Sequence, residues 1–422
     1  MSKVVKPKYT AEAEAGFTHR TAMEEAARCL LCHDAPCSKD CPAGTNPGDF
    51  IRAIRFRNPK GAAEIIRENN VMGGSCARVC PYGRLCEEAC SRCGIDVPIQ
   101  IGKLQRYAIE QEKIFKMKTL KAPAKKQKEK VACVGAGPAS MACAAELAKE
   151  GYKVTIFERE QKAGGVLTYG IVPSRLPQSV VDHDISTVKG LGVKFVLGKE
   201  VKAGDLEDFD AVFMGVGLWE PKIPDIPGTD LKGVYPANIF LKEARSSKGK
   251  FNPGKKVVVI GGGDVAIDCA VTAKLLGAEE VRIVYRRTFE EAPAYMPEFH
   301  YALSLGIGVT TNMAPAEVVG KKKVEAMQFQ GRKGVCEKSQ LTLEATTVVF
   351  AIGQGAEDVS DIAPVKLTEK GEIKVNKKGK TSDKRIFAAG DISNGGKTVV
   401  EAVAEGKEAA ASIMEYLKKG VK

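Results

Sequence analysis

Nine of the 13 cysteines lie between Cys29 and Cys93, and this concentration constrains the chain more than any other feature of its sequence. They form two runs, with Cys93 just beyond the second. The runs contain Cys29, Cys32, Cys37 and Cys41, then Cys76, Cys80, Cys86 and Cys90. Cysteine thiolates are the usual ligands of iron–sulfur cubanes. Two such runs therefore predict two iron–sulfur clusters in the first quarter of the chain.

The spacing of the first run is close to the ferredoxin pattern in which the cysteine before a proline ligates the other cluster. The gap between Cys32 and Cys37 holds four residues where that pattern has two, so the run is a variant. Structural zinc usually uses paired C-x2-C knuckles, but the second run has gaps of three and five residues and only His33 lies nearby. A disulfide framework suits small secreted domains, and this long chain begins without the apolar region of a signal peptide. We favour clusters over zinc or scattered core thiols.

Composition is that of a multidomain enzyme. A chain of 422 residues predicts about three domains, and 44% apolar residues suffice for ordinary cores. No stretch approaches the roughly 20 apolar residues needed to cross a bilayer, so we expect a soluble, cytoplasmic protein. Much of the net charge of +12 lies in residues 113–130, which we interpret as a solvated linker. We expect neither a nucleic-acid partner nor a membrane partner.

A βαβ unit with a dinucleotide fingerprint follows the linker. It consists of a strand at 131–134, the turn Gly135-Ala-Gly137 with Pro138 and Ala139, a helix at 141–149 and a strand at 153–157 ending at Glu158. Such glycines let backbone amides approach a pyrophosphate at the helix start, while the acid takes the ribose hydroxyls. Ser140 replaces the third small Gly or Ala. We expect these residues to bind a dinucleotide, the alternative being an accidental glycine-rich turn.

A second copy implies a second nucleotide. It comprises a strand at 256–260, the turn Gly261-Gly262-Gly263-Asp264-Val265, a helix through Lys274 and a strand at 281–284. Where the first copy has an acid, this one continues into Arg286 and Arg287. Guanidinium groups pair with a 2′-phosphate, which a carboxylate would oppose. The second site is therefore predicted to take NADP(H), unless the two arginines are merely solvated.

A third segment predicts the return of the chain to the first nucleotide. A strand ends at Gly390-Asp391, and a helix begins near Val399 after Lys397 and Thr398. Asp391 is placed to accept hydrogen bonds from a ribityl chain, and amides at the helix start can face the pyrimidine end of a flavin. A plain strand–helix corner is the alternative.

Several motifs now occur in one fixed order: VGAGPAS, GGVLTYGIVPSRLP, VIGGGDVAID, VYRRT, FAIGQ and FAAGD…TVVEAVAEGKEAA. With the cysteine runs they resemble the glutamate synthase small subunit and the N-terminal half of dihydropyrimidine dehydrogenase, from about Ala22 to Leu417. The resemblance implies an α-helical domain at 1–125 with two 4Fe-4S clusters. It also implies two α/β Rossmann-like domains of the three-layer ββα type, the FAD domain (126–220 and 346–422) being interrupted by an NAD(P)H domain at 221–345.

The resemblance also supplies site residues that spacing alone does not. It implies that Cys29, Cys32 and Cys37 share one cluster with Cys90. It gives the other cluster Cys41, Cys80, Cys86 and Gln105. Gln105 stands in the run Pro98-Ile-Gln-Ile-Gly-Lys-Leu-Gln, which matches the pyrimidine branch, whereas the glutamate synthase branch carries an acid there. Cys76 and Cys93 become spare.

Three further positions come from the same resemblance. Gly165 and Leu167 would contact FAD, and Gln354 would contact the nicotinamide nucleotide. Gln354 and the turn at 215–217 would mark the two crossovers between the nucleotide domains.

The implied function is electron input. NAD(P)H would give hydride to the flavin, and electrons would leave singly through the clusters to a partner, so few catalytic side chains are needed and none is assigned. We expect a subunit of a bacterial dihydropyrimidine dehydrogenase whose FMN- and iron–sulfur-containing partner reduces uracil or thymine. The small subunit of NADPH glutamate synthase, or of a ferredoxin:NADP transhydrogenase, is the alternative.

A flavin disulfide reductase is the rival from a different class. It needs a redox-active cysteine pair beside the flavin. Cys269 stands alone, and Cys133 and Cys143 fall on a strand and a helix. We interpret these three and Cys336 as core residues. The histidines His33, His183 and His300 are interpreted as surface or packing residues.

Overall fold

The computed structural model describes residues 8–420, which form two compact units. The larger unit contains Glu14–Thr168, Gln178–Leu218 and the chain from Ala356 onward. The smaller unit contains residues 8–13, Tyr169–Pro177 and Trp219–Gly355. Each is described separately below.

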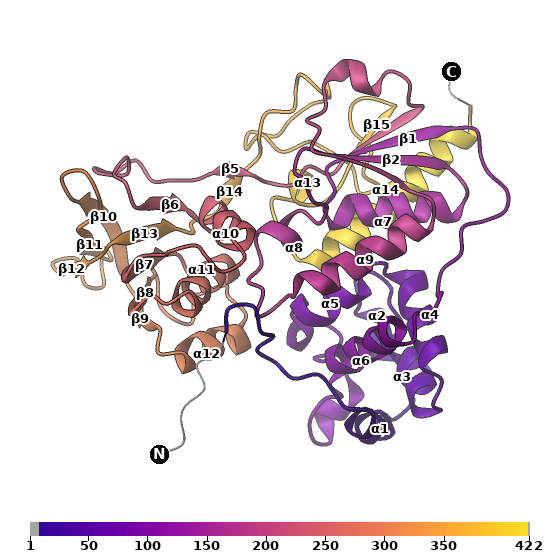
Figure 1. Cartoon of the computed structure of the whole chain (residues 1–422), viewed down its shortest axis with the longest axis horizontal. Helices are drawn as coiled ribbons and strands as arrows, with labels where there is room; N and C mark the ends of the chain where they lie inside the picture. Colours follow the sequence, from indigo (N-terminus) through magenta and orange to yellow (C-terminus); the bar gives the residue numbers. More distant parts are fainter. Residues whose placement is uncertain (1–7, 421–422) are drawn as a thin grey trace. The chain divides into compact units, whose positions relative to one another are not determined.

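The larger unit begins with short helices, drawn in indigo and purple in Figure 1. They are α1 (His19–Ala27), α2 (Pro36–Lys39), α3 (Pro47–Arg55), α4 (Pro59–Asn69), α5 (Gly73–Val79) and α6 (Ile101–Ile114), with 3-10 turns η1 (Tyr82–Arg84) and η2 (Ser91–Gly94). Asn46 and Asn58 cap α3 and α4, each followed by a proline at the first helical position. Apolar side chains such as Phe50, Ile66 and Leu104 are fully buried between these helices. The cysteines lie mostly in the irregular segments that connect them.

The rest of the larger unit is a parallel sheet with helices on it. The strand order is β15-β4-β1-β2-β3. The strands are β1 (Lys130–Val134), β2 (Lys153–Glu158), β3 (Lys194–Leu197), β4 (Ala211–Met214) and β15 (Ile386–Ala388). The helices are α7 (Pro138–Lys149), α8 (Val166–Tyr169), α9 (Gln178–Gly190), α13 (Asp391–Asn394), α14 (Val399–Lys418) and the 3-10 turn η3 (Ala203–Leu206). Figure 1 shows α7, α9 and α14 between this sheet and the N-terminal helices.

Close helix packing orders this layer. A Cβ added to Gly406 in α14 would lie 2.3 Å from the carbonyl oxygen of Ala139 in α7, so only glycine lets the two helices approach this closely. The other face of the sheet packs against irregular chain, including Val359, Ala363 and Ile373.

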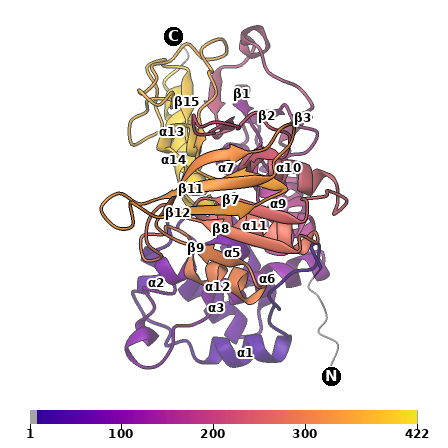
Figure 2. The same ribbon diagram turned by 90° about the vertical axis from the view of Figure 1, so that its left-hand side faces the viewer.

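The smaller unit has three layers. A parallel sheet of order β6-β13-β7-β8-β9 lies between helices and an antiparallel sheet of order β10-β11-β12, which faces the viewer in Figure 2. The parallel strands are β6 (Val234–Pro236), β7 (Lys256–Ile260), β8 (Glu280–Val284), β9 (Gly308–Thr310) and β13 (Thr347–Phe350). The antiparallel strands are β10 (Met313–Val319), β11 (Ala326–Gly331) and β12 (Gln340–Glu344). The helices are α10 (Ala237–Ser246), α11 (Asp264–Leu275) and α12 (Met296–Ser304), and a ribbon pairs β5 (Glu220–Pro221) with β14 (Gln354–Gly355).

Side chains that alternate in direction along each parallel strand explain why this sheet is covered on both faces. In β7, Val257 and Val259 pack with the helices, whereas Val258 and Ile260 pack with the antiparallel sheet. Successive strand side chains point to opposite faces, so a continuous apolar run marks a strand buried on both sides.

The fold class expected from the sequence is confirmed, but the boundaries differ. The second nucleotide domain does not end at residue 345, because β13 pairs with both β7 and β6 and the smaller unit continues to Gly355. Residues 8–13 also belong to the smaller unit, although the sequence places them in the helical domain at 1–125; residues 1–7 lie outside the described chain. Tyr169–Pro177 likewise belong to the smaller unit, although the sequence places them in the first part of the FAD domain, at 126–220. An apolar run such as 347–350 does not itself reveal which sheet it joins.

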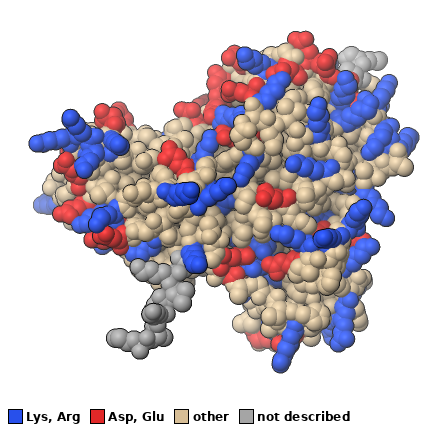
Figure 3. All heavy atoms as spheres, in the orientation of Figure 1, with Lys and Arg blue, Asp and Glu red and all other residues tan. Residues whose placement is uncertain are grey.

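On the face drawn in Figure 3, Lys and Arg side chains are interspersed with Asp and Glu. The described residues include no helix that is both long and apolar enough to span a membrane.

Candidate functional site

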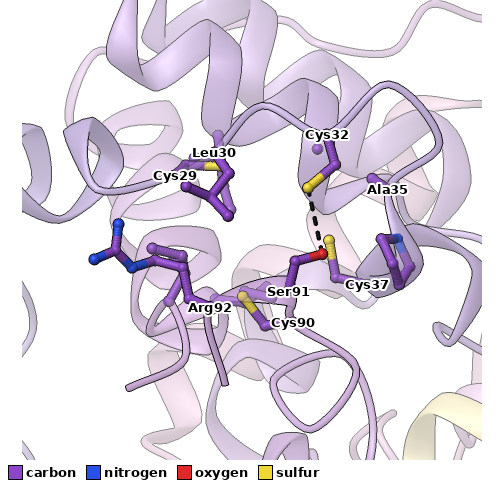
Figure 4. Close-up of a pocket in the computed structure, with 13 residues that line it drawn as sticks. Cys29, Leu30, Cys32, Ala35, Cys37, Cys90, Ser91 and Arg92 are labelled. Atoms are coloured by element: carbon purple, nitrogen blue, oxygen red, sulfur yellow. Dashed lines mark hydrogen bonds between the residues drawn. The ribbon is translucent and has the colours of Figure 1, made fainter. Parts of the chain in front are cut away.

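Four cysteines of the larger unit surround one pocket. Cys29, Cys32, Cys37 and Cys90 line it, and Figure 4 shows their side chains around a common space. Cys29 follows α1, Cys37 lies in α2, and Cys90 precedes η2. The pocket therefore gathers segments that are distant in the sequence. Leu30, which is 46% exposed, lies on its rim.

Arginines hold these segments together. Arg92 donates from its Nη1 to the carbonyl oxygen of Arg28 at 2.8 Å, and Arg28 donates from its Nη2 to that of Val97 at 2.7 Å. Arg55 donates to the carbonyl oxygen of Cys29 at 3.2 Å. These bonds fix the backbone next to Cys29 and Cys90 without occupying the sulfur atoms.

A second group of thiols lies deeper. A hydrogen bond with the Cys76 thiol, burial, and the neighbouring Cys86 and Cys41 sulfurs raise the pKa of the Cys80 thiol well above its usual value. Burial, with Cys41 and Cys37 nearby, also raises the pKa of Cys86. The structure thus brings together Cys41, Cys80 and Cys86, as expected, and adds Cys76.

Within the described residues, no three His, Cys, Asp or Glu side chains are arranged to hold a metal ion. The surroundings of the thiols nevertheless suit ligation of a cluster better than free thiol chemistry. Burial raises the pKa of Cys37 to about 11 and also raises the pKa values of Cys29 and Cys41. A buried thiol with a raised pKa is a poor nucleophile, and iron would supply the positive charge that stabilises its thiolate. All 13 cysteines are free.

Gln105 is placed beside α5. It is buried in α6, and its Nε2 donates to the carbonyl oxygen of Gly73, the first residue of α5, at 2.8 Å. Its amide oxygen, the atom that would ligate iron, has no hydrogen bond within the described residues. Among the described residues, Gln105 forms no hydrogen bond with a thiol. The exposed Cys93 bonds instead to the carbonyl oxygen of Glu87.

Thr45 also fits a cluster at Cys41. Thr45 is 2% exposed, and its hydroxyl has no oxygen or nitrogen partner among the described residues. Burial raises the pKa of the Cys41 thiol, while Thr45 and the amide of Ala43 act to lower it. A hydroxyl and amides aimed at a thiolate are typical of the outer shell of a metal site.

The first dinucleotide turn has the geometry that a pyrophosphate requires. Gly135 has φ +89°, and a Cβ there would lie 2.5 Å from the carbonyl oxygen of Gly215. Gly137 is the N-cap of α7 and Pro138 its first residue, with Ala139 buried behind them. No side chain caps α7, so its first amides are available to an anion.

Glu158, the last residue of β2, binds the backbone of this turn. Its two carboxylate oxygens accept from the backbone amides of Ala136 at 2.8 Å and Glu160 at 2.9 Å. Burial raises the pKa of this carboxyl. A Cβ on Gly165 would lie 3.1 Å from the Cα of Gly137, and Leu167 is fully buried nearby in α8.

The C-terminal segment returns to the same turn. A Cβ on Gly390 would lie 3.0 Å from the Cβ of Ala139. Asp391 accepts from the backbone amide of Lys397 at 3.2 Å, and burial raises its pKa. Thr398 caps α14, whose first residue is Val399, through a reciprocal bond with Glu401. Gly390 therefore approaches the first nucleotide turn, and Asp391 follows it directly in the chain.

The smaller unit holds the second turn. Gly261 has φ +150°, and a Cβ there would lie 2.3 Å from the carbonyl oxygen of Ala351; one on Gly262 would clash with the ring of Tyr285. Gly263 is the N-cap of α11, which has no side-chain cap. Asp264, expected at the nucleotide, accepts from the amide of Tyr295 at 2.7 Å. It therefore also anchors the loop after β8.

The remaining predicted residues of the smaller unit are accessible. Val265 is exposed on α11. Arg286 and Arg287 are exposed directly after β8, and within the described chain their guanidinium groups form no ion pair or hydrogen bond. Gln354 is half-buried in β14, opposite Pro221.

Sequence families match the two parts of this arrangement. Residues 129–406 match the pyridine nucleotide-disulphide oxidoreductase family, and residues 6–117 match dihydropyrimidine dehydrogenase domain II, 4Fe-4S cluster. The chain belongs to the pyridine nucleotide-disulphide oxidoreductase family. It is a flavin- and iron–sulfur-dependent oxidoreductase, with FAD, 4Fe-4S and NAD(P)H as its cofactors. The 4Fe-4S match decides against the zinc alternative.

Relatives within this family span the whole chain. The NAD-dependent dihydropyrimidine dehydrogenase subunit PreT of Escherichia coli O157:H7 is 43% identical over 97% of both chains. The glutamate synthase [NADPH] small chain of Escherichia coli K12 is 33% identical, covering 95% of this chain and 92% of its own. Both groups of the expected family are thus represented.

Solved structures share the fold alone. FprA from Mycobacterium tuberculosis in complex with NADPH gives a TM-score of 0.59 at 20% identity, covering 69% of this chain and 85% of its own. Thioredoxin reductase from Lactococcus lactis gives 0.57 at 21% identity, covering 69% of this chain and 100% of its own. Here Cys133 and Cys143 are buried together, and burial and their mutual hydrogen bond raise the pKa of Cys143. This pair lacks the reactive thiolate of a disulfide reductase.

Sequence patterns missed Thr45 and Lys407, which adjoin the Cys41 segment. Thr45 lies in no recognised motif. Lys407 lies in the segment TVVEAVAEGKEAA that carries the family resemblance, but that resemblance assigns it no role. Cys76 was noticed but set aside as spare, although the structure places it against Cys80.

Proposed function

We propose that this chain is the electron-input subunit of a dihydropyrimidine dehydrogenase. It oxidises NAD(P)H, carries electrons through two 4Fe-4S clusters, and delivers them to a partner subunit with FMN that reduces uracil or thymine. When bound, FAD accepts the hydride and the clusters carry single electrons. The side chains of this chain bind and orient these groups.

The observation that carries the proposal is the thiol arrangement. Cys29, Cys32, Cys37 and Cys90 surround one pocket with an exposed rim, and Cys41, Cys80 and Cys86 gather deeper in the same unit. Such thiols suit two clusters, of which the first is reachable by a partner. Gln105 is proposed as the fourth ligand of the second cluster, in keeping with the sequence motif.

The pyrimidine assignment rests on two comparisons. Identity is higher to the dihydropyrimidine dehydrogenase subunit, at 43%, than to the glutamate synthase small chain, at 33%. Gln105 also stands where the glutamate synthase branch carries an acid. The glutamate synthase small chain remains the second candidate because it covers nearly the whole chain.

Reconstitution tests this function. The purified chain, loaded with FAD and iron, should reduce artificial dyes with NADH or NADPH but leave uracil unchanged. Co-expression with an FMN-containing partner subunit should give NAD(P)H-dependent formation of dihydrouracil. The chain would be assigned to glutamate synthase instead if it supports the formation of glutamate from glutamine and 2-oxoglutarate with an amidotransferase partner and gives no dihydrouracil with the FMN-containing partner. Uracil reduction without any partner would refute the subunit assignment.

A further inference from the structure

Lys407 is a partly buried cation to which the sequence motifs assign no role. It lies in α14, and its Nζ donates to the carbonyl oxygens of Ala43 at 2.6 Å and Asn69 at 2.7 Å. No carboxylate forms an ion pair with it within the described residues. The charge of Lys407 is therefore held by two neutral acceptors.

Its two contacts lie on the segments that carry the deeper thiols. Ala43 belongs to the turn that starts at Cys41, where the amide of Gly44 donates to the carbonyl oxygen of Cys41 at 2.9 Å. A Cβ added to Gly44 would lie 4.0 Å from Nζ of Lys407. Lys407 thus touches the backbone two residues beyond Cys41.

The second contact, with Asn69, lies on the segment that continues through α5 to Cys80. Asn69 ends α4, and the next residue, Asn70, accepts from the amide of Met72 at 2.9 Å as the chain enters α5. That helix ends at its C-cap, Cys80. One ammonium group therefore joins both segments that contribute thiols to the deeper group.

We propose that Lys407 is a positioning residue that sets the reduction potential of the cluster held by Cys41, Cys80 and Cys86. This inference rests on the proposed placement of that cluster. Reduction adds one negative charge to a cluster, and a nearby cation in a medium of low dielectric stabilises the more negative state. Lys407 should therefore raise the potential of this cluster and favour its reduction by the flavin.

Burial disfavours the charged form of the Lys407 amine, so the contribution of its charge can be tested by substitution. Burial lowers the pKa of its amine and the neighbouring Lys149 lowers it further, while Glu146 and the Cys41 sulfur act to raise it. Glu146 is already paired with Lys149 at 2.6 Å. A thiolate-ligated cluster beside Cys41 is the remaining negative partner for Lys407.

The experiment is a redox titration of the full chain with FAD and both clusters, followed by electron paramagnetic resonance. Lys407→Met should lower the midpoint potential of one cluster and leave the other unchanged. A tenfold loss of stabilisation of the reduced state corresponds to about 59 mV for a one-electron couple. Lys407→Arg, which keeps the charge, should titrate like the native chain.

Two controls separate charge from structure. Lys407→Gln can still donate a hydrogen bond but carries no charge, so it should shift the same cluster as Lys407→Met does. Lys149→Met removes a neighbouring lysine that is paired with Glu146 and donates to the carbonyl oxygen of Glu68 at 2.9 Å; it should not shift that cluster selectively.

The outcomes are distinguishable. Native potentials in Lys407→Gln, with both clusters retained, would overturn the inference, as would equal shifts of both clusters. If Lys407→Met loses iron, the comparison of Lys407→Gln with Lys407→Arg still decides. About four irons per native chain instead of about eight would instead contradict the two-cluster function.

Discussion

At the scale of single residues, the proposed ligand Gln105 would make the two clusters differ. A neutral amide oxygen leaves its cluster less negative than one with four thiolates, so Gln105→Cys should lower the potential and change the spectrum of one cluster only. Electron paramagnetic resonance of anaerobic, reduced protein measures this. Gln111→Cys on the same helix is the matched control and should change neither cluster. Two unchanged clusters in Gln105→Cys would exclude Gln105 as a ligand.

Arg286 and Arg287 carry the prediction about nucleotide choice. Each charge-assisted hydrogen bond to a phosphate contributes about 1.5–3 kcal/mol, so Arg286→Gln with Arg287→Gln should lower kcat/KM for NADPH at least about tenfold and affect NADH far less. Dye reduction with each nucleotide checks this. Arg332→Gln is the control, because Arg332 is already paired with Glu291 at 2.6 Å. Equal losses, or a native preference for NADH, would show that the pair does not read a 2′-phosphate.

At the scale of elements, a buried charge network ties α5 to α9. Asp184 accepts from the amides of Gly74 and Ser75 at 3.2 and 2.7 Å and from Arg67 at 2.6 Å. Arg67 also bonds Glu112, and both carboxylates are buried. The helix that leads to Cys80 is thus anchored at its start by a carboxylate from the nucleotide-binding part of the same unit.

Breaking this network should be costly. Asp184→Asn leaves Arg67 incompletely paired, and removing one partner of a buried ion pair costs about 3–5 kcal/mol. The thermal midpoint should fall by several degrees, and iron should be lost more readily. Asp182→Asn is the matched control, since Asp182 is exposed on the same helix and, within the described residues, accepts a side-chain hydrogen bond from Gln178 alone. Equal midpoints for the two variants would refute this role.

Local elements were predictable from the sequence because their signals are short-range. The strand, glycine turn and helix at 131–149 and at 256–275 follow from adjacent residues, and α14 from its Thr398 cap. Asp184, Arg67 and Lys407 were not predictable, because their partners lie far away in the chain and no periodic pattern links them. The cysteine sets are an intermediate case: spacing predicts clusters, the family resemblance adds Cys90 to the Cys29 set, and the fold gathers both around one pocket.

At the scale of the whole molecule, the order of segments along the sequence does not reveal which segments belong to which unit. The smaller unit takes in Tyr169–Pro177 and β13, although both were expected in the FAD domain. Apolar strands such as 347–350 suit either parallel sheet, so composition could not assign them. The motifs recognised in the sequence nevertheless predict nucleotide and cluster ligands on one chain, and none of them assigns a pyrimidine pocket.

The central claim is that electrons leave this chain through its clusters, and Cys86→Ser tests it most directly. In the complex with an FMN-containing partner, NAD(P)H-dependent uracil reduction and dye reduction at FAD are measured on the same preparation. Cys93→Ser is the control, because Cys93 is exposed and bonds to Glu87 rather than to another thiol. We predict that Cys86→Ser abolishes uracil reduction while dye reduction stays near the native rate. Uracil reduction at the native rate in Cys86→Ser would contradict the account.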